Sequence, residues 1–138
     1  MAVTQLSVFL DNSIGRLAEV TRILGEHQIN IRGFSVADTA DFGILRLLVN
    51  DEPGALDALR AAKFTVHTGP IVLARIPDIP GGLASALEAF ARHNINVEYA
   101  YAIVKSLIAF GIEDIAAGEA LLVEKGIPLV SPQELMEI

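Results

Sequence analysis

An internal repeat constrains the fold of this 138-residue chain more than any other feature of its sequence. The matched pairs, 66 residues apart, are Gly15 and Gly81, Leu17 and Leu83, His27 and His93, Ile29 and Ile95, and Asn30 and Asn96. Further along, the offset falls to 63, where Asp51 matches Asp114 and Leu59 matches Leu122. A repeat of this length predicts two related structural units. We therefore expect a first domain at residues 1–69 and a second at residues 70–138, joined at Gly69 and Pro70.

Each copy predicts the same order of secondary-structure elements. Leu6, Val8 and Leu10 alternate with their neighbours, a period of two that is typical of a strand with one buried face. The first copy continues with a helix after Gly15, strands at 29–37 and 43–49, a helix that begins near Pro53, and a strand near 64–68. The second copy predicts a strand at 71–76, a helix at 81–93, strands at 95–103 and 106–112, a helix at 114–125, and a strand at 127–130. The order βαββαβ predicts an α+β fold of two tandem ferredoxin-like units, each an antiparallel sheet with its helices on one face.

Charge and composition exclude several classes of partner. The formal net charge is −7, with 17 acidic and 10 basic residues, so we expect neither nucleic acid nor an anionic membrane surface as a partner. The chain has no Cys, which excludes disulfides and Cys-ligated metals, and we expect no metal and no cofactor. The first residues carry neither an export signal nor a membrane span, so we expect a cytoplasmic protein.

Apolar residues exceed the share that is usual in a soluble domain. Hydrophobic residues make up 52% of the chain even before its 11 glycines are counted. A unit of about 66 residues buries too little surface by itself to be robust. We therefore expect the two copies to pair with each other and two chains to form a homodimer.

The segment around Gly81 and Gly82 is the candidate site. Pro80 and the two glycines turn the chain from a strand into a helix, without a side chain over the first N–H groups of that helix. Such a helix N-terminus can accept a carboxylate, while Asp78 could hold an ammonium group and Asn96 could offer an amide. The alternative interpretation is that these residues are ordinary helix caps and turn residues.

The stretch Asp78-Ile79-Pro80-Gly81-Gly82-Leu83, followed after a helix by Asn96-Val97, resembles the ACT domain, and the tandem arrangement resembles small proteins with two ACT copies. The resemblance implies a βαββαβ module that binds amino acids where the Gly-containing loop of one module faces strand residues of another. The implied ligand-binding residues are Asn12, Gly15, Arg16, Leu17 and Asn30 in the first copy, and Asp78, Gly81, Gly82, Leu83 and Asn96 in the second. The first loop departs from the pattern, because Ile14 stands where the family commonly has Pro and Asn12 stands in the place of Asp78.

An enzymatic function finds little support in the residues. His27 and His93 end their predicted helices, where we interpret them as C-terminal caps, and His67 has no identifiable partner in the sequence. Tyr99 and Tyr101 line either a ligand pocket or an interface. We therefore expect no catalytic residues and a small regulatory protein that senses amino acids, with a regulated metabolic enzyme as a possible partner. The alternative is a ligand-free ACT pair that serves as an assembly module.

Overall fold

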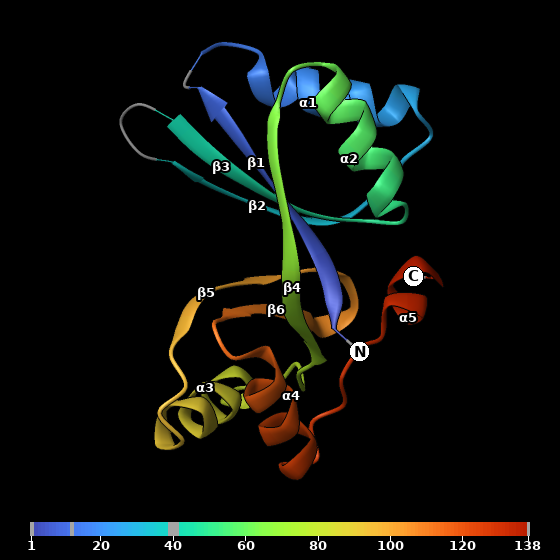
Figure 1. Cartoon of the computed structure of the whole chain (residues 1–138). Helices are drawn as coiled ribbons and strands as arrows, with labels where there is room; N and C mark the ends of the chain where they lie inside the picture. Colours follow the sequence, from blue (N-terminus) through green and yellow to red (C-terminus); the bar gives the residue numbers. More distant parts are fainter. Residues whose placement is uncertain (1, 12, 39–41, 138) are drawn as a thin grey trace. The chain divides into compact units, whose positions relative to one another are not determined.

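The computed structural model describes residues 2–11, 13–38 and 42–137 (Figure 1). By its internal contacts the chain divides into two compact units. The first unit is Thr4–Gly69, and the second unit is Pro70–Glu137 together with the start of the chain up to Val3.

The first unit contains β1 (Val3–Asp11), α1 (Arg16–Glu26), β2 (Ile31–Asp38), β3 (Phe42–Val49), α2 (Glu52–Ala61) and the first part of β4 (Thr65–Arg75). Its strands follow the order β2-β3-β1-β4, and both described pairings of β3 are antiparallel. In the register, Leu47 of β3 lies opposite Leu6 of β1 and Phe34 of β2. This is the ferredoxin-like arrangement that the order of elements predicts.

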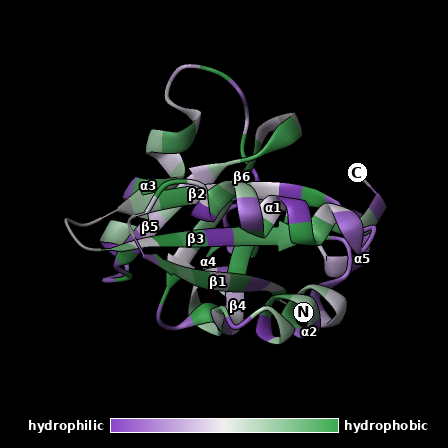
Figure 2. Ribbon diagram, turned by 90° about the horizontal axis from the view of Figure 1, so that it is seen from above, coloured by the Kyte–Doolittle hydropathy of each residue, from purple (hydrophilic) through white to green (hydrophobic). Residues whose placement is uncertain are grey.

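The core of the first unit lies between one face of the sheet and its two helices. Leu6 and Val8 of β1 are buried together with Leu24 of α1 and Leu59 of α2. Figure 2 shows hydrophilic and hydrophobic residues alternating along α1, whereas β1 and β3 are mainly hydrophobic. The apolar side of α1, with Val20 and Leu24, is buried in this core. The predicted placement of both helices on one face is confirmed.

The second unit contains the rest of β4, α3 (Gly82–Arg92), β5 (Val97–Ala102), a 3₁₀ turn η1 (Val104–Ser106), β6 (Leu107–Ile112), α4 (Ile115–Glu124) and α5 (Pro132–Glu137). Its strands follow the order β4-β6-β5 with antiparallel pairing. Phe90 of α3 packs against Phe110 of β6 in its core, with 5.3 Å between the ring centroids. None of the helices in the described part of the chain is long and apolar enough to span a bilayer.

Three predicted strands differ from the structure. The strands expected at 64–68 and 71–76 form one continuous strand, β4, so Gly69 and Pro70 lie within a strand rather than between two. This is possible because the fixed φ of proline suits extended backbone. The strand expected at 127–130 is reduced to a bridge between Leu129 and Ala74.

Candidate ligand-binding loops

In the second unit, the loop from Pro77 to Gly81 connects β4 to α3 and requires glycine at its end. The Ile79 N–H donates to the Pro77 carbonyl at 2.9 Å, and the Gly82 N–H donates to the Ile79 carbonyl at 3.0 Å. Gly81 has φ +84°, in the left-handed region that favours glycine. A Cβ at Gly82 would overlap the Pro77 carbonyl oxygen. Both glycines are therefore built into the tight turn that starts the helix.

The N-terminus of α3 carries no side-chain cap in the described structure, because Gly81 occupies the N-cap position. The first intrahelical bond runs from the Ser85 N–H to the Gly81 carbonyl at 2.9 Å. The N–H groups of a first helical turn have no partner within the helix and form the positive end of its dipole. In the described structure Asp78 therefore does not cap this helix, contrary to the alternative interpretation of the sequence.

A cavity of about 460 Å³ lies beside this loop. Gly81 and Gly82 line it together with Ser85 and Arg92 of α3, and Lys125 at the end of α4. Arg92 and Lys125 are the charged residues of its lining, and although Arg92 Nη2 also lies 3.6 Å from Glu88 Oε2, both side chains suit an anionic group such as a carboxylate. Sequence reasoning missed both. Arg92 follows Ser85 by seven residues on one helix face, and Lys125 directly follows α4.

The other predicted residues of the second unit lie outside that cavity. Asp78 is exposed at the tip of the loop, and the Leu83 side chain is 41% exposed. Asn96 lines a separate groove at the start of β5. The 11 residues of α3 separate the loop from Asn96, a length of about 16 Å. Within the second unit, the structure therefore does not bring the loop and Asn96 into one cavity.

In the first unit the equivalent loop is held by charges. Gly15 has φ +87°, as at Gly81, but the next residue is Arg16. Its Nε lies 2.7 Å from Asp11 Oδ1 and its Nη1 lies 2.6 Å from Glu19 Oε1. The guanidinium also lies over the Phe64 ring, 4.5 Å from the centroid. A ligand carboxylate that bound Arg16 would have to compete with these two carboxylates.

The charges of this loop also perturb titration. The hydrogen bond that Arg16 donates to Asp11 lowers the pKa of Asp11 below its usual value and raises the pKa of Arg16. Sequence reasoning missed Asp11 and Glu19 as partners of Arg16, although a spacing of three residues on a helix predicts the second pair.

The remaining predicted residues of the first unit are spread along it. Leu17 is 40% exposed on the first turn of α1. Asn30 lies beyond the other end of α1, where its N–H donates to Asn50 Oδ1 at 2.9 Å and its carbonyl accepts from the Asn50 N–H at 3.2 Å. Asn12 lies outside the described residues.

The histidines have structural partners. His27 and His93 are the C-cap residues of α1 and α3, which confirms the interpretation from the sequence. Their Nδ1 atoms lie 2.8 Å from the Ile23 carbonyl and 2.9 Å from the Ala89 carbonyl. His67 meets Phe9 edge to face, with 5.1 Å between the ring centroids. The described residues contain no cluster of three or more His, Asp or Glu side chains that could hold a metal ion.

Solved structures share this fold. A protein from Bacteroides thetaiotaomicron is 33% identical in sequence with a TM-score of 0.93, covering 100% of this chain and 98% of that chain. The regulatory subunit of aspartate kinase from Thermus thermophilus, in its ligand-free form, is 18% identical with a TM-score of 0.65, covering 90% and 93%. The regulatory subunit from Thermus flavus is 17% identical with a TM-score of 0.64, covering 90% and 92%. At these lower identities the likeness shows the fold alone.

The family of the chain follows from its whole length. No curated protein matches the chain. A family model described as an ACT domain pair matches residues 1–138, which include both β–α loops and both sheets. This chain therefore belongs to the family of ACT domain pairs, which are regulatory rather than catalytic domains.

Proposed function

We propose that this protein binds free amino acids at its β–α loops and acts as a sensor or regulator of amino-acid metabolism. The observation that carries the proposal is the Pro77–Gly82 loop, where an uncapped helix N-terminus opens beside a cavity of about 460 Å³ lined by Arg92 and Lys125. Membership of the ACT family supports it. The cytoplasm is the expected compartment.

The charges around the loop fit a zwitterion. A carboxylate in the cavity would meet the N-terminus of α3 and the side chains of Arg92 and Lys125. Asp78 on the exposed tip would meet an ammonium group nearby. A phosphate would fit less well, because Asp78 would repel it.

A second copy of the chain would complete the site. The loop and Asn96 lie in separate concavities of one unit, so a ligand that contacts both kinds of residue needs a module from elsewhere. The edge strand β2 exposes Phe34 and Val36, apolar side chains that pairing with another chain would cover. A homodimer with a ligand between modules accounts for both observations.

A thermal-shift panel of the twenty standard amino acids tests the proposal. An amino acid at 100 times its dissociation constant stabilises the folded state by about 2.7 kcal/mol, which raises the melting temperature measurably. The variant Asp78→Ala should lose most of that shift, and the control Asp57→Ala, an exposed carboxylate of α2, should keep it. A shift that is the same in both variants would remove Asp78 from the site.

The alternative, an assembly module without a ligand, is favoured by one observation. Ile14 and Ile79 on the two loops are among the most exposed apolar side chains of the described structure. Stable dimers together with no thermal shift from any amino acid at millimolar concentration would support this alternative. Sedimentation velocity measures the dimer, and the same panel measures the ligand.

A further inference from the structure

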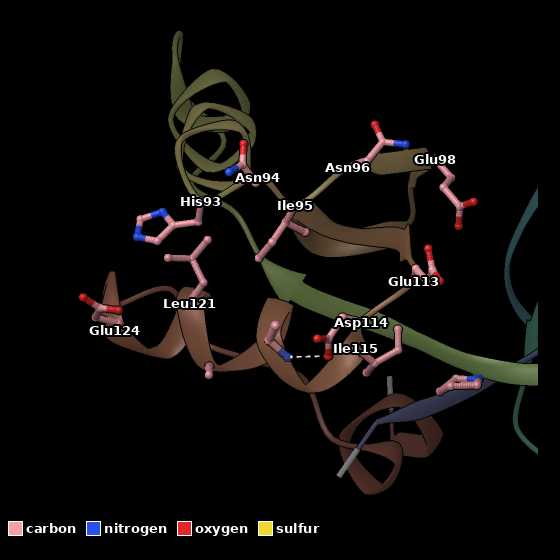
Figure 3. A pocket seen from close by; sticks show the side chains of 13 residues that line it. His93, Asn94, Ile95, Asn96, Glu98, Glu113, Asp114, Ile115, Leu121 and Glu124 are labelled. Carbon is pink, nitrogen blue, oxygen red and sulfur yellow. Dashed lines mark hydrogen bonds between the residues drawn. The ribbon is translucent and has the colours of Figure 1, made fainter.

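A second concavity of the second unit has no part in the loop described above. It is a groove of about 1040 Å³ between the start of β5 and α4. Ile95, Ala117, Ala120 and Leu121 form its apolar part. Figure 3 shows the Ile95 and Leu121 side chains directed toward each other in the middle of the groove.

Carboxylates lie at both ends of this apolar part. Glu98 and Glu113 lie at the end near Asn96, and Glu124 lies at the end near His93 (Figure 3). All three are exposed, and none forms a salt bridge within the described part of the chain. The 13 lining residues include no Lys and no Arg. The groove is therefore electronegative at both ends with an apolar middle.

Two further polar groups of the groove are already engaged. Asp114 Oδ1 accepts from the Ala117 N–H at 3.1 Å as the N-cap of α4, and His93 Nδ1 lies 2.9 Å from the Ala89 carbonyl. The carboxylates that remain free to bind a partner are therefore Glu98, Glu113 and Glu124, because Asp114 caps α4.

The repeat shows that the fold does not require these residues. Arg32 stands in the first unit where the second has Glu98, and Asn50 stands in place of Glu113. On the helix, Asp57 replaces Ala120 and Ala61 replaces Glu124. The two units share one fold, so the three carboxylates at the ends and the apolar Ala120 are particular to the second unit. A difference confined to one copy indicates a role other than folding.

We propose that this groove docks a segment of a partner protein, one that places an apolar side chain over Ile95 and Leu121 and basic side chains at the acidic ends. Charge complementarity selects this occupant, because three free carboxylates in a lining without Lys or Arg favour basic side chains. Pairing of this groove with the same groove of a second copy is disfavoured, since both carry the same carboxylates. Amphipathic segments in apolar grooves are a general mode of recognition.

This inference extends the proposed function by giving a regulated protein a place to bind, and it does not depend on amino-acid binding. The probe is a library of random peptides displayed on phage and selected on the full-length protein. We expect the selected peptides to share an apolar residue flanked by Lys or Arg, and fluorescence anisotropy then measures their affinity. Enrichment without basic residues, or no enrichment, would overturn the proposal.

Variants of the groove test whether the selected peptides bind there. Glu98→Lys combined with Glu124→Lys should weaken binding at least about tenfold, and the control Glu26→Lys combined with Asp57→Lys makes the same change of net charge on the first unit. Ala120→Asp, which introduces the residue of the first unit, should weaken binding without altering net charge at the two ends. Equal weakening by the groove and control pairs would show attraction to the net charge only and would overturn the proposal.

Amino-acid binding is measured separately in the same variants, by thermal shift. The groove variants should keep their melting temperatures and any thermal shift caused by an amino acid. Loss of peptide binding with the amino-acid shift intact supports the groove. If no amino acid shifts the melting temperature but peptide binding still depends on Glu98 and Glu124, the sensor function is contradicted and the docking groove is supported.

Discussion

The two β–α loops share a backbone and differ in their chemistry. The N-cap glycines have φ and ψ of 87° and 0° at Gly15, and 84° and −6° at Gly81, so both helices begin in the same way. The next residue is Arg16 in the first loop, paired with Asp11 and Glu19, and Gly82 in the second. The same backbone geometry therefore supports two kinds of loop. In the first loop Arg16 is paired with neighbouring carboxylates, and in the second the helix N-terminus is left open.

The same comparison explains why one residue can be Arg in one loop and must be Gly in the other. The turn in front of Arg16 is wider, because its backbone nitrogen lies 3.4 Å from the Ser13 carbonyl oxygen. In the second loop the Gly82 nitrogen lies 3.0 Å from the Ile79 carbonyl oxygen. In the tighter turn a Cβ would overlap the Pro77 carbonyl oxygen. Glycine at position 82 follows from the turn as well as from any ligand.

The largest effect is expected from Gly82→Ala. The new Cβ must displace backbone rather than a flexible side chain, so we expect a loss of about 2–3 kcal/mol in the free energy of unfolding. Urea denaturation measures it. Position 16 already carries a Cβ, so the matched variant Arg16→Ala loses only two partly exposed ion pairs and the contact with Phe64, and its loss should be smaller than that of Gly82→Ala. Equal losses in both variants would contradict the difference between the turns.

A smaller effect is expected in the core of the second unit. A Cβ at Gly118 of α4 would overlap Ile112 Cδ1, whereas the first unit has Ala55 and Val49 at these two positions. Gly118→Ala should therefore cost about 1–2 kcal/mol, since overpacking outweighs the gain of about 1 kcal/mol in helix propensity.

The double variant Ile112→Val with Gly118→Ala copies the first unit and provides the control. It should recover most of the loss, because valine lacks the overlapping Cδ1 atom. Thermal and urea unfolding of the single and double variants form a double-mutant cycle. Additive losses would show that the two residues do not compensate each other.

The smallest effect is a pH dependence confined to the first loop. The pKa of Asp11 is lowered in the folded state by Arg16, so its contribution is present above the unfolded pKa of about 3.9 and is lost as pH falls through the folded pKa. Asp11→Asn should therefore lower the urea midpoint slightly at pH 7, and this difference should shrink at acidic pH.

Asp57→Asn serves as the control, because Asp57 is an exposed carboxylate away from both loops. Its urea midpoint should show no comparable dependence on pH. A difference between the protein and Asp11→Asn that grows at acidic pH would reverse the assigned direction.

The sequence by itself determined the order of helices and strands in each copy, apart from the strands at the joint of the two copies and the last strand of the second copy. The period of two in β1, the glycines at both N-caps and Pro53 at the start of α2 are local signals, because strands, turns and helix ends depend on neighbouring residues. The histidine caps were readable for the same reason, since each ring meets a carbonyl four residues earlier.

Only the tertiary structure decided which residues share a cavity. Arg92 and Lys125 line one cavity with Gly81 although they are distant from it in the sequence, Arg16 is paired with Asp11 and Glu19, and Asn96 lies in the acidic groove instead. Periodicity cannot give these results, because each depends on where the packing of a helix on a sheet places residues that are distant in the sequence. The continuity of β4 through Gly69 and Pro70 was likewise not predicted, because these two residue types are also typical of turns.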